Sequence, residues 1–252
     1  MRLLTTVVLS LLLASTGFSE ELFNFDDGTN GGLNEYSALE PFGLGASFTV
    51  AGGTYRISGP GNTVDEQLSV NRASAFSSTI YSDFRVSVDV VDWDTSLVDG
   101  QGIDLFARGQ EIGLGTSDGY GFVFQPAEGI RIFRADDEVP TFFSDHVPLD
   151  IDPLKNYHLV FTGSGPNLVG QIYDLADLNN PLEEVTATDS TYEQGVSGIL
   201  ATGPIQNPTI GFDSTFDNLT LSGQVVPEPS TVSLFALGAL GLLGLCRRRV
   251  SA

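Results

Sequence analysis

The sequence predicts an all-β domain folded as an antiparallel β-sandwich, and three observations carry this prediction. Residues that favour strands and turns are abundant: the 252 residues include 29 glycines and 17 phenylalanines, whereas methionine occurs once. Several segments alternate apolar and polar residues with the two-residue period of a half-buried strand. Hairpin turns join neighbouring segments, and no crossover helix separates them. The hydrophobic fraction of 41% suffices for a core, so we predict one domain over residues 20–223.

The clearest strand is predicted over residues 84–90. Apolar side chains occupy every second position from Phe84 to Val90, and polar side chains occupy the positions between them. One face of this strand should therefore be buried and the other should meet solvent.

Two hairpins are predicted from their turn residues. The first joins residues 119–124 to 129–134, and the second joins 157–162 to 168–173 across a five-residue Gly/Pro turn. Further strands are predicted at 21–25, 47–50, 54–58, 102–108, 195–201 and 212–221. About a dozen short antiparallel strands favour two sheets packed face to face.

The N-terminus has the three parts of a secretory signal peptide. Met1 and Arg2 give a positive start, an apolar run covers residues 3–13, and small residues precede Glu20. This run is too short to span a membrane. We predict a signal peptide over residues 1–19, cleaved after Gly17 or Ser19, and hence an exported protein.

The C-terminus combines a proline-flanked acid, an apolar segment and an arginine cluster. In order, these are Pro227-Glu228-Pro229, residues 231–246 and Arg247-Arg248-Arg249. A helix over the apolar segment would be roughly 24 Å long, short of the hydrocarbon core of roughly 30 Å. The arginines should stay in the cytoplasm and the domain on the far side. We predict one short transmembrane helix, a marginal permanent anchor.

These C-terminal parts resemble the PEP-CTERM sorting signal, which we place at residues 224–252. Pro227, Glu228 and Pro229 match its motif residue by residue. The resemblance implies processing by an exosortase, a membrane transpeptidase that removes the tail, in bacteria that typically also make exopolysaccharide. It also implies a final place in the cell envelope, at the cell surface or in the extracellular matrix. The alternative is an ordinary single-pass tail anchor.

The charge of the domain excludes two classes of partner. Seven of the 11 basic residues and 31 of the 32 acidic residues lie between Glu20 and Val226, which gives this segment a net charge of −24. Such a surface repels nucleic acids and anionic membranes. Solubility outside the cell and capture of cations both remain open as reasons for the charge. The single cysteine, Cys246, lies outside the domain, which excludes an intramolecular disulfide and a thiolate zinc site.

The order of predicted strands resembles the concanavalin A-like, laminin G-like jelly roll of many exported bacterial proteins. The resemblance is carried by residues 83–88, by the hairpin over 157–173 and by the closing segment 216–221. It implies a surface or matrix protein that binds or organises extracellular polysaccharide. The alternative is an exported glycan-acting enzyme on the same fold.

No catalytic motif supports that alternative. Enzymes on this fold that hydrolyse β-glucans carry a Glu-x-Asp-x-(x)-Glu run, and the nearest cluster, Asp89, Asp92 and Asp94, lacks a glutamate. His146 and His158 have no metal-ligand spacing with another His or Cys. Serine-hydrolase and nucleotide-binding motifs are also absent. We therefore predict a non-enzymatic protein.

Two binding sites are predicted on the jelly roll. Calcium often ties the first strand to the last in this fold, which implicates Asp26, Asp27 and Asp217; the same residues are also typical of turns and bulges. Carbohydrate rings stack on aromatic side chains, and Trp93 with Tyr81 and Tyr120 is the candidate platform. Aromatic residues also form β cores, so both interpretations of this trio remain open.

Overall fold

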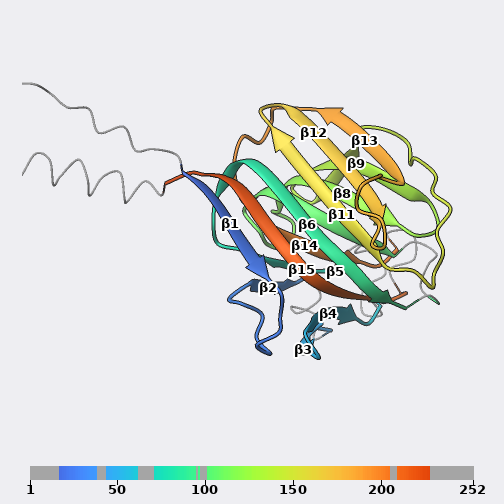
Figure 1. The fold of residues 1–252 in the computed structure, drawn as a ribbon. Coiled ribbons are helices and arrows are strands. Elements are labelled where there is room, and N and C mark those ends of the chain that lie inside the picture. Colours follow the sequence, from blue (N-terminus) through green and yellow to red (C-terminus); the bar gives the residue numbers. More distant parts are fainter. Residues whose placement is uncertain are drawn as a thin grey trace, which may run out of the picture. The chain divides into compact units, whose positions relative to one another are not determined.

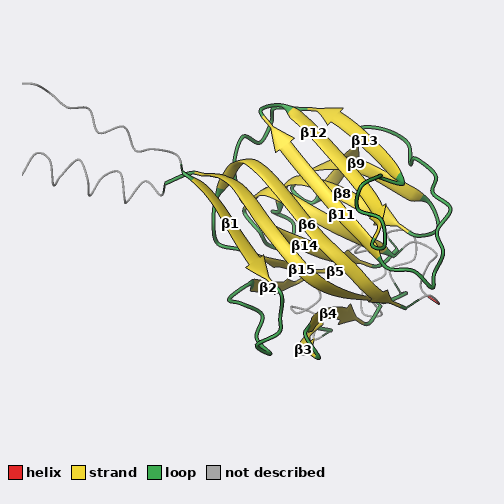
Figure 2. Ribbon diagram, viewed as in Figure 1, coloured by secondary structure: helices red, strands yellow, loops and turns green. Residues whose placement is uncertain are grey.

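The computed structural model describes residues 17–38, 44–61, 71–94, 96, 101–204 and 209–227. Residues Phe18–Val225 form one compact unit built from fifteen β-strands, all paired antiparallel (Figures 1 and 2). The strands make two sheets, here called sheet A and sheet B. The prediction of an antiparallel β-sandwich is confirmed.

Sheet A has eight strands. Seven follow the order β13 (Glu183–Thr188), β12 (Asn167–Asp174), β11 (Tyr157–Ser164), β6 (Tyr81–Trp93), β15 (Phe212–Val225), β4 (Thr54–Gly59) and β3 (Ser47–Ala51). The eighth, β1 (Phe18–Phe23), pairs with the second half of β15, while β4 pairs with its first half. Because β15 is the last strand of the domain, the first strand, β1, lies directly beside the last.

Sheet B has seven strands. Their order is β10 (Val139–Phe142), β9 (Gly129–Asp136), β8 (Asp118–Gln125), β7 (Gly102–Gln110), β14 (Val196–Thr202), β5 (Arg72–Phe76) and β2 (Asn34–Ser37). Figure 1 shows β8, β9 and β14 behind the strands of sheet A.

The core lies between the two sheets. The apolar face predicted for residues 84–90 is buried, with Val86, Val88 and Val90 fully inaccessible to solvent. Sheet B supplies Ile103, Leu105 and the aromatic rings of β8 from the other side. Burial of this face stabilises the sandwich because each fully buried Val or Leu contributes about 1.5–3 kcal/mol.

Two local expectations need correction. The hairpin of β11 and β12 has a two-residue turn instead of five, because Ser164 already pairs with Asn167. Gly165 has φ +51°, a conformation that glycine adopts without strain. The first strand runs over Phe18–Phe23 and not over 21–25, since the chain turns at Phe25, whose φ is +57° and whose ring stacks on Tyr55 in the core.

Most of the two predicted targeting segments lies outside the described residues. This holds for the signal peptide up to residue 16, for Glu228 and Pro229, for the apolar segment and for Arg247, Arg248 and Arg249. Across the part of the chain that the structure describes, no helix is long and apolar enough to cross a membrane.

Candidate ligand-binding pocket on sheet B

Strand β7 directs one acidic side chain away from the core. Ile103 and Leu105 fill the space between the sheets and are fully buried. Since side chains alternate along a strand, Asp104 and Phe106 face the opposite side of sheet B. This side, which we call the outer face of sheet B, lies away from sheet A.

Two glycines of β8 shape this outer face. Gly121 lies opposite Phe133 of β9, and a Cβ atom at Gly121 would come within 2.2 Å of the Phe133 ring. Gly119 makes room for Phe106 in the same way, at 2.7 Å. Because Gly119 and Gly121 carry no side chain, the rings of Phe106 and Phe133 lie close over β8.

A cavity of about 380 Å³ opens over this aromatic floor. Its volume lies within the range of small-molecule sites, and such sites combine apolar walls with a few polar groups. The lining residues that matter for binding are Arg72, Asp104, Phe106, Arg131, Phe133 and Phe142.

Asp104 lies in the cavity wall with 3% of its surface exposed. Its Oδ1 atom is buried and has no hydrogen-bond partner among the described residues. Burial raises the pKa of Asp104 well above its usual value, and the charges of Arg131 and Arg72 oppose this shift without cancelling it. A buried carboxyl group without a partner costs free energy, which a ligand could recover.

Arg131 of β9 contributes a cation to the cavity wall. Its guanidinium carbon lies 3.3 Å from the centre of the Phe142 ring, and its Nη2 donates to Gln125 Oε1 at 3.3 Å. The Nε atom is buried and has no partner within the described ranges. Burial lowers the pKa of Arg131, although an arginine stays charged near neutral pH.

Arg72 is engaged with protein groups. It forms an ion pair with Glu138 and a hydrogen bond with Tyr36. Glu138 also accepts from the Ser117 hydroxyl at 3.3 Å, and only 7% of its side chain is exposed. The tight turn after β9 turns the carboxylate of Glu138 inward to Arg72.

The structure places the predicted aromatic platform in the core. Trp93, Tyr81 and Tyr120 are 6%, 1% and 0% exposed. The Trp93 ring packs on Phe124 and Tyr157, with centroids 6.3 and 5.8 Å apart. Because all three side chains are buried, the platform does not form there; Phe106, Phe133 and Phe142 line the cavity instead.

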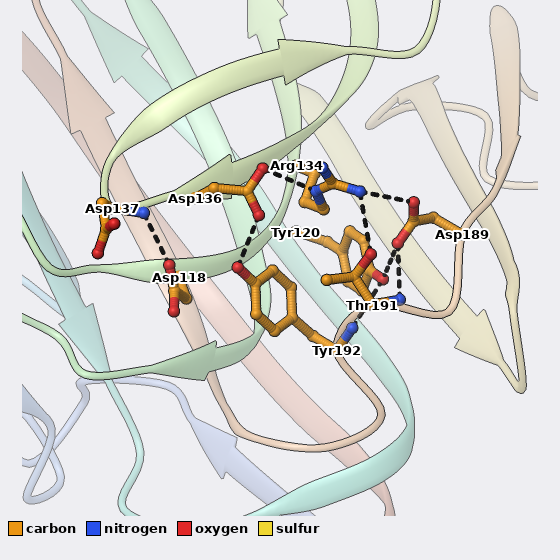
Figure 3. Close-up of polar contacts among 8 residues, drawn as sticks. All are labelled: Asp118, Tyr120, Arg134, Asp136, Asp137, Asp189, Thr191 and Tyr192. Carbon is orange, nitrogen blue, oxygen red and sulfur yellow. Dashed lines mark hydrogen bonds and ion pairs between the residues drawn. The ribbon is translucent and has the colours of Figure 1, made fainter.

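Tyr120 belongs to a polar network that fastens the 189–192 loop to β8 and β9 (Figure 3). Its hydroxyl donates to Asp189 Oδ1 at 2.5 Å, and Arg134 donates to Asp189 Oδ2 at 2.9 Å. The backbone N–H of Tyr192 donates to the Tyr120 oxygen at 3.0 Å, while its hydroxyl donates to Asp136 at 2.8 Å. These hydrogen bonds hold the loop against the two strands.

The three residues predicted to bind calcium are only partly brought together. Burial raises the pKa of Asp217, and the negative charges of Asp89 and Asp26 raise it further against a hydrogen bond from Asn218. Asp26 and Asp217 therefore lie close enough to interact. Asp27 instead accepts from the N–H and hydroxyl of Thr29, at 2.9 and 2.8 Å. Within the described residues, no group of three or more His, Cys, Asp or Glu side chains is arranged to hold a metal ion.

Each histidine is hydrogen-bonded to protein groups. His146 Nε2 lies 2.6 Å from Gln125 Oε1, and its Nδ1 lies 2.9 Å from Glu128. His158 Nδ1 lies 2.6 Å from Asp89 Oδ1, and Asn218 donates to the other oxygen of Asp89 at 2.9 Å. These partners fix both rings in place.

Comparison with known families addresses the C-terminus. The PEP-CTERM protein-sorting motif matches residues 225–249. The chain carries a PEP-CTERM motif. This motif implies an exported protein that is sorted to the cell envelope and processed by an exosortase. No curated protein matches the chain.

Solved structures resemble the domain. The basic lectin of winged bean, crystallised with Tn-antigen, has 9% identity and a TM-score of 0.57, and the match covers 84% of this chain and 100% of the lectin. The exoplasmic domain of VIP36 with Ca²⁺ and Man3GlcNAc bound has 12% identity and a TM-score of 0.52, covering 82% of this chain and 89% of that one. Arcelin-5, a lectin-like defence protein from Phaseolus vulgaris, has 10% identity and a TM-score of 0.52, covering 84% and 100%. At these identities the likeness is one of fold, and the predicted concanavalin A-like jelly roll is confirmed.

Proposed function

We propose that this chain is an exported, non-catalytic surface or matrix protein that binds extracellular polysaccharide in the cavity on the outer face of sheet B. One observation carries the proposal: the cavity holds a buried carboxyl oxygen of Asp104 that has no partner among the described residues, beside apolar and aromatic walls. Sugar hydroxyls donate hydrogen bonds and sugar rings pack on aromatic faces, so a sugar satisfies both features.

Two further observations support this function. The sorting motif belongs to exported proteins of the cell envelope, where polysaccharide is available. The winged bean lectin and VIP36 structures contain a glycan on the same fold, which supports a sugar-binding role without identifying the sugar.

Binding is favoured over hydrolysis by the state of the acidic groups in the cavity. A glycosidase needs one carboxyl group as acid and a second as base or nucleophile. The carboxylate of Glu138 is held by Arg72 and Ser117, and Asp137 is exposed in the turn after β9. Asp104 is the buried acid of the wall whose Oδ1 has no partner among the described residues.

Calcium is a second part of the proposal. The oxygen ligands that calcium prefers are present at Asp26 and Asp217, whose negative charges act on each other, while Asp27 has its own partner in Thr29. Calcium bound there would neutralise the carboxylates between the turn after β1 and the irregularity of β15, where its register with β6 shifts between Asp217 and Thr220. It would thereby stabilise the junction of the first and last strands.

The binding proposal is tested with polysaccharide extracted from the matrix of the source cells. Phe142 lines the cavity, whereas Phe18 is 74% exposed on β1 of sheet A. Phe142→Ala should weaken binding at least about tenfold, roughly 1.4 kcal/mol, and the control Phe18→Ala should bind like the wild type. Equal binding by both variants, with both folded, would refute the assignment of the cavity.

A further inference from the structure

We infer that the cavity on sheet B selects sugars bearing a carboxylate, so that the polysaccharide it binds is acidic. This inference rests on the proposed function and adds the substrate class. It is argued from the polar atoms that face the cavity and from the charge of the rest of the domain.

The free polar groups of the cavity suit a ligand rich in hydrogen-bond acceptors. Arg131 Nε is a buried donor without a protein partner among the described residues. Its guanidinium is held against Phe142, which fixes the direction of the remaining donors. An arginine pairs best with a carboxylate, because the charge-assisted hydrogen bonds are about twice as strong as neutral ones.

Asp104 joins Arg131 as a donor when it is protonated. Burial raises the pKa of Asp104 well above its usual value, which favours the neutral acid in the folded domain. A neutral carboxyl group donates a hydrogen bond to a ligand carboxylate, and the two carboxyl groups then share one proton. The other titratable or charged groups that line the cavity are Tyr36, Arg72, Arg131, Asp137 and Glu138. Near Arg131 lie Glu128, Asp145 and His146, whose charges interact with its guanidinium.

The charges of these groups set the sign of the preferred ligand. Arg72 and Glu138 form an ion pair, and Arg131 is the cation that lies beside Asp104, with the carboxylates of Glu128 and Asp145 also near enough to act on it. A protonated Asp104 leaves the wall positive where the two side chains meet. An amino sugar would place its ammonium against this cation, whereas a uronic acid would place its carboxylate there.

The rest of the domain is strongly acidic. Residues 20–226 carry a net charge of −24, which repels polyanions at long range. Salt near physiological strength screens this repulsion beyond about 8 Å but screens a buried contact much less. A polyanion that binds this protein must therefore do so through a local site, and added salt should not weaken the binding.

The first experiment compares one polymer with and without its carboxylates. The full-length chain, purified in mild detergent, is titrated with alginate and with alginate whose carboxyl groups have been reduced to alcohols. Free glucuronate is a third ligand and separates recognition of one sugar from recognition of a polymer. We expect alginate to bind at least about tenfold more tightly than the reduced polymer.

The second experiment uses variants of the two donors. Arg131→Gln should lose the preference for alginate over the reduced polymer. The control Arg56→Gln removes an arginine whose side chain is 55% exposed and which pairs with Asp213 in sheet A, and it should keep the preference. Wild-type affinity for alginate should fall at least about tenfold as the pH rises through the raised pKa of Asp104 and this group loses its proton. Asp104→Asn should remove this dependence and bind more tightly than the wild type at the higher pH.

The outcomes separate this inference from the proposed function. Equal affinity for alginate and the reduced polymer, with Phe142→Ala weakening both, would overturn the acidic preference and leave sugar binding intact. Failure of the matrix polysaccharide and of every polymer to bind would refute the proposed function itself. A preference that persists in folded Arg131→Gln would also overturn the inference, because another group would then recognise the carboxylate.

Discussion

Phe18 lies opposite Gln224 in the register of β1 and β15, so the first strand of the domain begins beside the end of the last. Ser19 follows opposite Gly223. Both residues therefore belong to the paired part of β1, although the sequence also allows signal-peptide cleavage after Ser19. Retaining the whole of β1 requires cleavage after Gly17.

We accordingly expect the mature protein to begin at Phe18. N-terminal sequencing of the exported protein checks this, and a chain that begins at Glu20 would contradict it. Signal peptidase needs a small residue before the cut, so Gly17→Leu should block processing. Ser19→Leu should leave processing unchanged, because Ser19 lies beyond the cut.

The sorting motif leads to a second expectation. Glu228→Ala, or deletion of Arg247, Arg248 and Arg249, should leave unprocessed precursor in the inner membrane, because the exosortase then lacks its motif or the tail loses its cytoplasmic hold. Immunoblots of cell fractions measure precursor against product. Asp150→Ala removes an exposed acid within the domain and should process normally. Unchanged processing of the Glu228 variant would argue for an ordinary tail anchor.

Most strands could be predicted from the sequence, including the edge strand β3, whereas β2, β5, β10 and β13 could not. Strands with one buried face, such as β6 and β11, alternate clearly and were predicted close to their bounds. Of the strands that were not predicted, β2, β10 and β13 are short strands at sheet edges. An edge strand packs on one neighbour, so its sequence carries less of the apolar pattern that marks a strand. Strand β5 lies inside sheet B, but its sequence, Arg-Ala-Ser-Ala-Phe, contains no β-branched residue and so gives a weak strand signal.

The cavity on sheet B was not predicted from the sequence. Strand β7 is buried on both faces and carries apolar residues on both, with Ile103 and Leu105 on one face and Phe106 on the other, so its sequence does not show which face is the core. The signal that could have found the cavity was the single acid within that strand, Asp104, together with Gly119 and Gly121 in the next strand. Trp93 was chosen because it lies at the end of a strand, but the end of a strand can face either the core or solvent.

The network around Asp189 leads to a third expectation. Burial raises the pKa of Asp189, but the hydrogen bonds from Tyr120 and Thr191, with the charge of Arg134, outweigh burial and lower the pKa. A lowered pKa means that the ionised form stabilises the fold above the pKa of the unfolded chain. This stabilisation is lost as the pH falls through the folded pKa.

Asp189→Ala should therefore lower the free energy of unfolding by about 2 kcal/mol near neutral pH, since it removes the acceptor of the Tyr120 hydroxyl and one of the two acids that pair with Arg134. Tyr120→Phe should cost about 1–2 kcal/mol. Urea denaturation of the single and double variants measures both. Strictly additive effects would contradict a shared network, because residues in contact couple by about 0.5–3 kcal/mol.

The carboxylates at the junction of β1 and β15 give the last expectation. The pKa of Asp217 is raised by burial, by Asp89 and by Asp26, so its ionised form destabilises the fold. In chelator, the wild type should lose stability as the pH rises through the raised pKa, and Asp217→Asn should not.

In calcium, ionised Asp217 should instead stabilise the fold, because a bound cation turns the repulsion among the carboxylates into attraction. At 100 times its Kd calcium adds about 2.7 kcal/mol, which corresponds to a rise in Tm of about 5–10 °C. The rise should be absent in Asp217→Asn and present in Asp150→Ala. A wild-type Tm that is the same in calcium and in chelator would mean that the acids at this junction serve only the turn and the bulge.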